Sequence, residues 1–372
     1  MEFLIKPKET TMPSLAAAGW RATGALQKWQ TWDACRRTID TLDPVKDRKK
    51  IEELKPRVND ADRALKTNPS LDEHLGFWRV ELVSRAMTTS EPWQQEVNDV
   101  FRTLTRNYDI LLTKGCSMHV HVSPRLTPEI RYTMPQLRGI LKAIAYYDQS
   151  ITKIMPADRK NNEWAMSNFL APNTLKAVKD AYAAVPRAGW VPLFALYDKI
   201  RMVQNIHREL HGSDRYMSWN FSNVTDECGT IEFRRPPGVD SAVKARHWAG
   251  FALAFIAQGM ATDWRDMSST SLKFHVPVPY LARFVDSGEK RLESASRGAL
   301  KYQAVVEDTR PATVYSVREL AVIKRKKAAK EKEGSPFAQK QANSRPNTPS
   351  TRSNSPGAQS THSNSSRKFW KK

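Results

Sequence analysis

Cysteine is scarce in this 372-residue chain, and its scarcity excludes one class of fold. Only Cys35, Cys116 and Cys228 are present, an odd number at wide spacing. Small secreted domains are held by even sets of cysteines, whereas reducing compartments leave thiols unpaired. The sequence therefore predicts no disulfide framework and a cytoplasmic protein.

Long apolar runs are absent as well. The most apolar stretch, residues 248–261, is too short to cross a bilayer and follows Lys244, Arg246 and His247. The first residues also lack the charged and then apolar pattern of a secretory leader. We therefore expect a soluble protein that makes no use of a membrane.

Acidic residues are outnumbered, 39 against 59 lysines and arginines, for a formal net charge of +20. Residues 324–372 hold thirteen of these basic residues against two glutamates, so they contribute +11 and leave about +9 for the rest. A positive excess attracts nucleotides, acidic substrates or nucleic acid. Nucleic acid is thus an expected partner of the C-terminal segment.

The composition changes near residue 321. A basic run at 324–327 leads into Ser, Asn, Thr, Pro and Gln with almost no aliphatic residues, and such a segment cannot offset its ordering entropy by burial. We expect a folded domain over residues 1–320 and a disordered tail over 321–372. The basic run is either a nuclear address or a solvated stretch, and the Ser-Pro and Thr-Pro pairs at 335, 348 and 355 are candidate phosphorylation sites.

Hydrophobic periodicity before the tail indicates both helices and strands, and a hydrophobic fraction of 40% suffices for a sizeable core. Strands are expected at residues 2–5, 77–84, 114–123, 215–223 and 230–235, the last two as an antiparallel hairpin. Helices are expected at 14–41, 47–66, 92–108, 135–155, 174–184 and 195–210, with another beginning at 240 or 241. The predicted fold class is α+β.

Two of these strands carry reactive side chains on one face. Side chains alternate across a strand, so His119 and His121 project together, and so do Glu232 and Arg234. Such a set could hold a metal ion and a phosphate. Alternatively, the histidines lie on a solvated face, and zinc is a second choice of metal that would need three or four protein ligands.

Glu81 and Glu232 stand among apolar neighbours, where an unpaired charge is costly. A hard divalent cation, Mg²⁺ or Mn²⁺, would compensate them. An ion pair of Glu232 with Arg215, Arg234 or Arg235 would do so equally well. Arg159 and Arg215 are candidates for neutralising a transferred phosphate, because guanidinium groups match phosphate oxygens, or they are ordinary surface charges.

Together these segments resemble the amidoligase family, relatives of glutamine synthetase and of the glutamate-cysteine ligases in the carboxylate-amine ligase superfamily. The resemblance covers roughly residues 2–285 and rests on four motifs in order: Glu81-Leu82-Val83-Ser84, Ser117-Met118-His119-Val120-His121, Ser218-Trp219-Asn220-Phe221 and Ile231-Glu232-Phe233-Arg234. It implies a glutamine-synthetase-like antiparallel sheet curved around the active site, with helices packed outside and ATP entering one end.

The resemblance also implies roles for individual residues. The implied chemistry is the ATP-dependent joining of a carboxylate, on a small molecule, peptide or protein, to an amine through an acyl phosphate, with metal ions and arginines stabilising the transferred charge. The expected metal ligands are Glu2, Glu81, His119, His121 and Glu232; the expected nucleotide-binding residues are Arg215, Asn220 and Arg234; and the expected catalytic residues are Arg159, Arg215 and Arg234.

The chain departs from the family at its start. Family members open with Glu-x-Glu-Phe, whereas this sequence opens with Met1-Glu2-Phe3, so Glu2 matches the second glutamate and the first is missing. Either the start codon has been placed too late or a metal ligand, and with it catalysis, has been lost. In the second case the protein is a binding platform rather than an enzyme.

Overall fold

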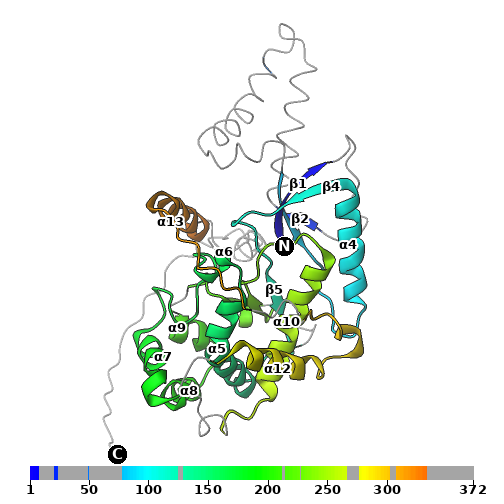
Figure 1. Ribbon diagram of the computed structural model, residues 1–372. Coiled ribbons are helices and arrows are strands. Elements are labelled where there is room, and N and C mark those ends of the chain that lie inside the picture. Colours follow the sequence, from blue (N-terminus) through cyan, green and yellow to red (C-terminus); the bar gives the residue numbers. More distant parts are fainter. Residues whose placement is uncertain are drawn as a thin grey trace, which may run out of the picture. The chain divides into compact units, whose positions relative to one another are not determined.

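The computed structural model describes residues 1–7, 21–23, 49, 78–124, 129–211, 214–226, 228–265, 276–301 and 307–332. It is a mixed α+β structure in which helices predominate (Figure 1). The chain divides into two units, Met1–Val314 and Tyr315–Lys372. In the part that the structure describes, no helix has both the length and the apolar character needed to span a membrane.

Four strands form an antiparallel sheet in the order β2-β3-β1-β4. They are β1 (Glu2–Pro7), β2 (Arg21–Thr23), β3 (Trp78–Val83) and β4 (Tyr108–Leu111). The strands expected at residues 2–5 and 77–84 are confirmed. The expected helix at 14–41 is wrong at β2, because residues 21–23 pair with β3 and satisfy their backbone hydrogen bonds there. The rest of 14–41, and 47–66 apart from residue 49, lie outside the described residues.

Two long helices follow their sequence signals closely. Helix α4 (Trp93–Asn107) begins after Pro92, as expected, and leads directly into β4. Helix α5 (Met134–Ile154) begins with a capping box, in which Thr133 and Gln136 each accept a hydrogen bond from the other's backbone N–H. These reciprocal bonds explain why α5 starts at the predicted position.

Four shorter helices follow: α6 (Ala157–Lys160), α7 (Lys176–Ala188), α8 (Val191–Lys199) and α9 (Asn205–His211). The single helix expected at 195–210 is wrong, since the chain breaks between α8 and α9. Ile200 has extended dihedrals, φ −67° and ψ 121°. Its carbonyl accepts a hydrogen bond from the side chain of Arg138 on α5 at 2.5 Å. This bond takes the place of the backbone N–H that would donate to the carbonyl in a continuous helix.

A second antiparallel sheet has the order β5-β7-β6 and consists of β5 (Val120–Val122), β6 (Trp219–Asn220) and β7 (Ile231–Phe233). The hairpin predicted from residues 215 to 235 is confirmed, with shorter strands. Its connection contains the 3-10 helix η2 (Ser222–Val224) and Gly229, whose φ of 58° suits glycine. The expected strand at 114–123 is regular only over β5.

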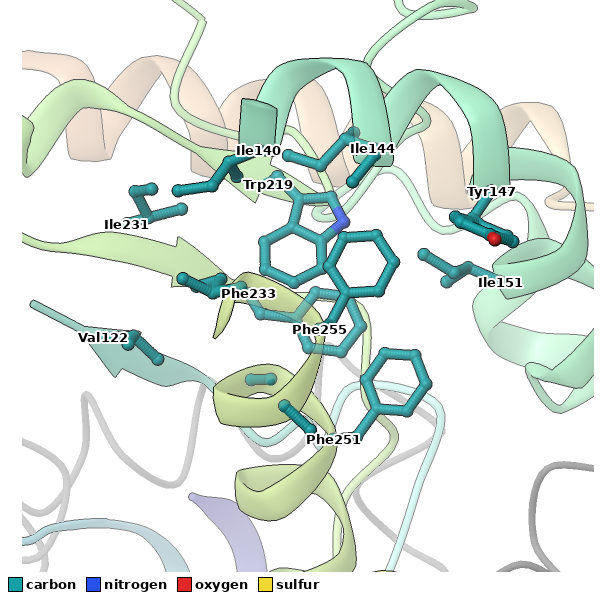
Figure 2. Packing of buried hydrophobic residues seen from close by; sticks show 14 of the residues in the cluster. Val122, Ile140, Ile144, Tyr147, Ile151, Trp219, Ile231, Phe233, Phe251 and Phe255 are labelled. Carbon is teal, nitrogen blue, oxygen red and sulfur yellow. The ribbon is translucent and has the colours of Figure 1, made fainter. Parts of the chain in front are cut away.

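The core lies where the second sheet meets α5 and α10 (Ala242–Ala261). Figure 2 shows Trp219 and Phe255 between the strands and the aliphatic side chains of α5. Trp219 stacks on Phe233 and on Phe255, with ring centres 4.2 and 5.1 Å apart. Helix α12 (Val278–Glu289) packs against α10, and the 3-10 helix η3 (Ser294–Ser296) contacts α4. This rigid aromatic layer fixes the position of the second sheet.

The second unit contains helix α13 (Val317–Lys332). Ser316 and Glu319 form its N-terminal cap, since each side chain accepts a hydrogen bond from the other's backbone N–H. Residues 321–332, which composition placed in a disordered tail, are helical instead. Residues 333–372 lie outside the described residues.

Candidate functional site

The second sheet gathers polar residues on one of its faces. Glu232 lies directly opposite His121 on one side and opposite Asn220 on the other. Directly opposed residues share a face of the sheet, and residues two positions away share it too, which adds His119 and Arg234. Sequence alternation had paired the residues within each strand, and the strand register brings the pairs together.

The carboxylate of Glu232 is the centre of this cluster. Its Oε1 lies 2.6 Å from Nη1 of Arg234, 3.1 Å from Nδ1 of His119 and 3.5 Å from Nε2 of His121. Its Oε2 accepts a hydrogen bond of 2.8 Å from Nδ2 of Asn220. Both oxygens are therefore occupied by donors, and only 4% of the side chain is exposed.

The same contacts determine the charge of Glu232. Burial by itself would raise the pKa of this carboxyl, because it disfavours the ionised form. Hydrogen bonds with His119 and His121 and the charge of Arg234 act in the opposite direction and hold the pKa well below its ordinary value of 4.5. Glu232 is thus an ionised, buried acceptor at neutral pH.

A second layer of polar groups orients the first, and the sequence reasoning did not identify it. Oγ of Ser117 lies 3.0 Å from Nε2 of His119, and Oγ1 of Thr230 lies 3.1 Å from Nδ1 of His121. Nε of Arg234 donates to the carbonyl of Trp164 at 3.3 Å. Strand alternation could have identified Ser117, since it precedes His119 by two residues. Nothing in the sequence indicated Trp164.

Two arginines lie against one aromatic ring. The guanidinium carbons of Arg215 and Arg234 lie 5.3 and 5.8 Å from the ring centre of Tyr216, within the range of cation–π contacts. Tyr216 is buried and packs edge-on against Trp164, with ring centres 5.1 Å apart. Arg215 and Arg234 therefore share one aromatic contact, although no strand pairing joins Arg215 to the Glu232 cluster.

Arg159 is a buried arginine that binds backbone carbonyls. It is 2% exposed, and its guanidinium donates to the backbone carbonyls of Arg235 and Arg234 at 3.0 and 2.7 Å. These bonds anchor the chain that follows β7. Arg159 thereby positions Arg234, and a catalytic role for Arg159 itself stays a prediction.

Glu2 and Glu81 belong to the four-stranded sheet. They are direct register partners across β1 and β3, so two of the expected metal ligands are brought together there. The other three, His119, His121 and Glu232, are brought together in the second sheet. Among the described residues, no group of three or more His, Cys, Asp or Glu side chains has an arrangement that could hold a metal ion.

A comparison with protein families identifies the chain. The family described as "putative amidoligase enzyme" matches residues 38–256, more than half of the sequence. The protein belongs to the amidoligase family. No curated protein and no solved structure matched the chain.

The match to the amidoligase family includes all four motifs, from Glu81 to Arg234, and it also includes Arg159 and Arg215. It begins after Glu2 and ends before residue 285, so it is shorter at both ends than the resemblance suggested. Every residue of the Glu232 cluster lies inside the matched segment.

The donor set of this amidoligase cluster does not fit a divalent cation as it is arranged. Two imidazoles and a carboxylate are suitable ligand types, but Oε1 of Glu232 already faces the cationic Arg234 and Oε2 already accepts from Asn220. The sequence left two ways to compensate the charge of Glu232, a divalent cation or an ion pair with an arginine. The structure contains the ion pair with Arg234. A cation at Glu232 would first have to displace that guanidinium.

Proposed function

We propose that this amidoligase-family protein is a carbon–nitrogen ligase that joins a carboxylate to an amine at the expense of ATP, through an acyl phosphate. One observation carries the proposal: the guanidinium groups of Arg215 and Arg234 both contact the ring of Tyr216. Phosphoryl transfer depends on positioned positive charge, and arginine forks match the oxygens of phosphates and carboxylates.

Each residue of the cluster has a proposed part in this reaction. Arg215 and Arg234 bind the transferred phosphoryl group or the substrate carboxylate, Asn220 helps to hold the nucleotide, and Glu232 holds Arg234 until an anion replaces it. Arg159 keeps the backbone of Arg234 in place through its bonds to the two carbonyls. Since these groups are already fixed by partners, little reorganisation is needed when charge develops.

Magnesium or manganese would enter with the nucleotide and neutralise its phosphates. The Glu232 cluster does not fit a cation as it is arranged, and Glu232 is paired with Arg234 instead. The family resemblance further implies one curved sheet around the active site. We propose that the sheet carrying Glu2 and Glu81 and the sheet carrying Glu232 are parts of it, within a catalytic domain over residues 1–320.

The test is the stability of the full chain with and without ATP and Mg²⁺. A ligand at a hundred times its dissociation constant stabilises the folded state by about 2.7 kcal/mol and raises the melting temperature. We expect this rise in the wild type and its loss in Arg215→Lys and Arg234→Lys, since lysine has no planar fork. Release of phosphate should then require both a carboxylate and an amine.

Arg283→Lys is a matched control. Arg283 also lies over a tyrosine ring, 4.4 Å from the centre of Tyr280, but it belongs to α12 and is exposed. Its substitution should leave the response to ATP unchanged. If ATP does not raise the melting temperature of the wild type, or raises that of all variants equally, the ligase proposal is wrong. A protein that serves as a binding platform would then be favoured.

A second candidate function is nucleic-acid binding by α13, in a protein of the cytoplasm or nucleus. Lys324, Arg325 and Lys326 are exposed on this helix. Binding through phosphate neutralisation weakens steeply with salt. Affinity for duplex DNA or RNA should therefore fall when salt rises from 50 to about 200 mM, and it should disappear on deletion of residues 324–327. Salt-independent binding would contradict it.

A further inference from the structure

A cavity of about 410 Å³ lies between α5, α7 and the loop that precedes α7. Its lining residues are Gln149, Phe169, Leu170, Lys179, Tyr182, Ala183 and Pro186. The volume is within the range of small-molecule sites, roughly 300–1,000 Å³. None of the lining residues belongs to the Glu232 cluster, and the ligase proposal gives the cavity no role.

The aromatic wall of the cavity is held rigidly. The rings of Phe169 and Tyr182 stack with centres 4.4 Å apart, and both residues are buried. The hydroxyl of Tyr182 donates to Oδ2 of Asp148 at 3.2 Å, and Nε2 of Gln149 donates to the same hydroxyl at 3.2 Å. Asp148 is in turn paired with the buried Arg235. The wall is therefore formed before any ligand arrives, as is usual for small-molecule sites.

These bonds leave two polar side chains of the lining open to a ligand. Burial and the charge of Asp148 raise the pKa of Tyr182, so its hydroxyl keeps its single proton and gives it to Asp148. Gln149 uses one N–H of its amide on that hydroxyl and keeps the second. The amide of Gln149 and the ammonium of Lys179 are thus the groups that can recognise a ligand.

Lys179 provides the positive charge of the cavity. Its Nζ donates to the carbonyl of Pro172 at 2.8 Å, which uses one of its three hydrogens. The neighbouring acid, Asp180, is paired with Lys176 at 2.5 Å. Within the described part of the chain, no carboxylate pairs with Lys179. Its charge is therefore available to an anionic ligand.

The rest of the lining is apolar and partly open to water. Leu170 is 61% exposed, and Ala183 and Pro186 are exposed on the last two turns of α7. An apolar ligand that covers Leu170 and rests against the aromatic wall would remove this surface from water. The cavity thus combines an apolar wall with one cation.

We propose that this cavity binds a small carboxylic acid with an aromatic body. The carboxylate pairs with Lys179 and accepts the second N–H of Gln149, and the body lies against Phe169, Leu170 and Pro186. This site goes beyond the proposed ligase and needs no nucleotide.

The test is a calorimetric titration of the full chain with 2-naphthoate in the absence of ATP. We expect saturable binding. The neutral analogue 2-naphthamide has the same rings, and it should bind about fivefold more weakly because it cannot form the ion pair. Lys179→Met should weaken binding of the acid about fivefold and leave binding of the amide unchanged.

Two further variants locate the site. Ala183→Trp should abolish binding of both compounds, because the indole fills the cavity, and thermal melts establish that it is folded. Lys176→Met is the matched control, since Lys176 lies on the same helix, is exposed and does not line the cavity. It should bind 2-naphthoate as the wild type does.

Three results would overturn the proposal: no binding of 2-naphthoate by the wild type, undiminished binding by folded Ala183→Trp, or equal loss of acid and amide binding in Lys179→Met. The ligase proposal is tested separately. Ala183→Trp should keep the response to ATP, and Arg215→Lys should keep the binding of 2-naphthoate. Loss of naphthoate binding in Arg215→Lys would place the acid at the Glu232 cluster and refute the cavity.

Discussion

Arg235 and Asp148 form an ion pair in which both side chains are buried, with Nη1 3.5 Å from Oδ1 and exposures of 1% and 2%. Oδ2 of Asp148 accepts further hydrogen bonds from Ser167 and Tyr182 at 2.9 and 3.2 Å. This pair joins α5 to the residue that follows Arg234. It therefore links the core to the candidate site.

Loss of one partner of this pair should be costly. We expect Asp148→Ala to lower the free energy of unfolding by about 3–5 kcal/mol, because it leaves a buried guanidinium uncompensated. The double variant Asp148→Leu with Arg235→Met should be more stable than Asp148→Ala, since no buried charge remains. Urea denaturation measures both, and a loss below about 1 kcal/mol in Asp148→Ala would contradict this account.

Glu232 should make the protein sensitive to acid. Its folded pKa lies well below 4.5, so its stabilising contribution is fully present above pH 4.5. That contribution is lost as the pH falls from 4.5 through the folded pKa. Urea denaturation of the wild type and Glu232→Gln over this range should give a steeper fall for the wild type, and parallel curves would refute the prediction.

His247 should give a separate dependence at higher pH. The ring is buried, which lowers its pKa from 6.5 to about 4. Between these values the unfolded chain binds a proton that the native ring does not, so stability falls by up to about 3 kcal/mol as the pH drops from 6.5 to 4, and no further below.

His247→Gln should remove this dependence. Nδ1 of the ring accepts a hydrogen bond from the backbone N–H of Lys301 at 3.1 Å, and the glutamine oxygen is an acceptor that does not titrate. The free energy of unfolding at pH 7, 5.5 and 4, taken as the difference between the two proteins, measures the effect. A difference that stays constant with pH would rule it out.

Close helix contact should make Gly288 intolerant of a methyl group. A Cβ at this position of α12 would collide with the carbonyl oxygen of Ala254 on α10. We expect Gly288→Ala to destabilise the protein by about 1–3 kcal/mol despite the better helix propensity of alanine. Gly115→Ala is the control, since its Cβ would lie 3.7 Å from the nearest atom. Equal melting temperatures for the two variants would contradict the prediction.

The sequence by itself determined much of the local structure. Apolar spacing placed α4, α5 and the start of α10, because this signal acts within a few residues. Strand alternation placed His119 with His121 and Glu232 with Arg234. Motif order indicated the amidoligase family, which the family comparison confirmed.

Only the tertiary structure decided how these pieces meet. The register of β5, β7 and β6 sets His121 and Asn220 beside Glu232, and Arg215 and Arg234 both contact the Tyr216 ring. It also places the guanidinium of Arg234 against the carboxylate of Glu232. Such outcomes depend on contacts between residues far apart in the chain, and no local pattern encodes which donor comes closest. The break between α8 and α9 has the same origin, since its hydrogen-bond donor comes from α5.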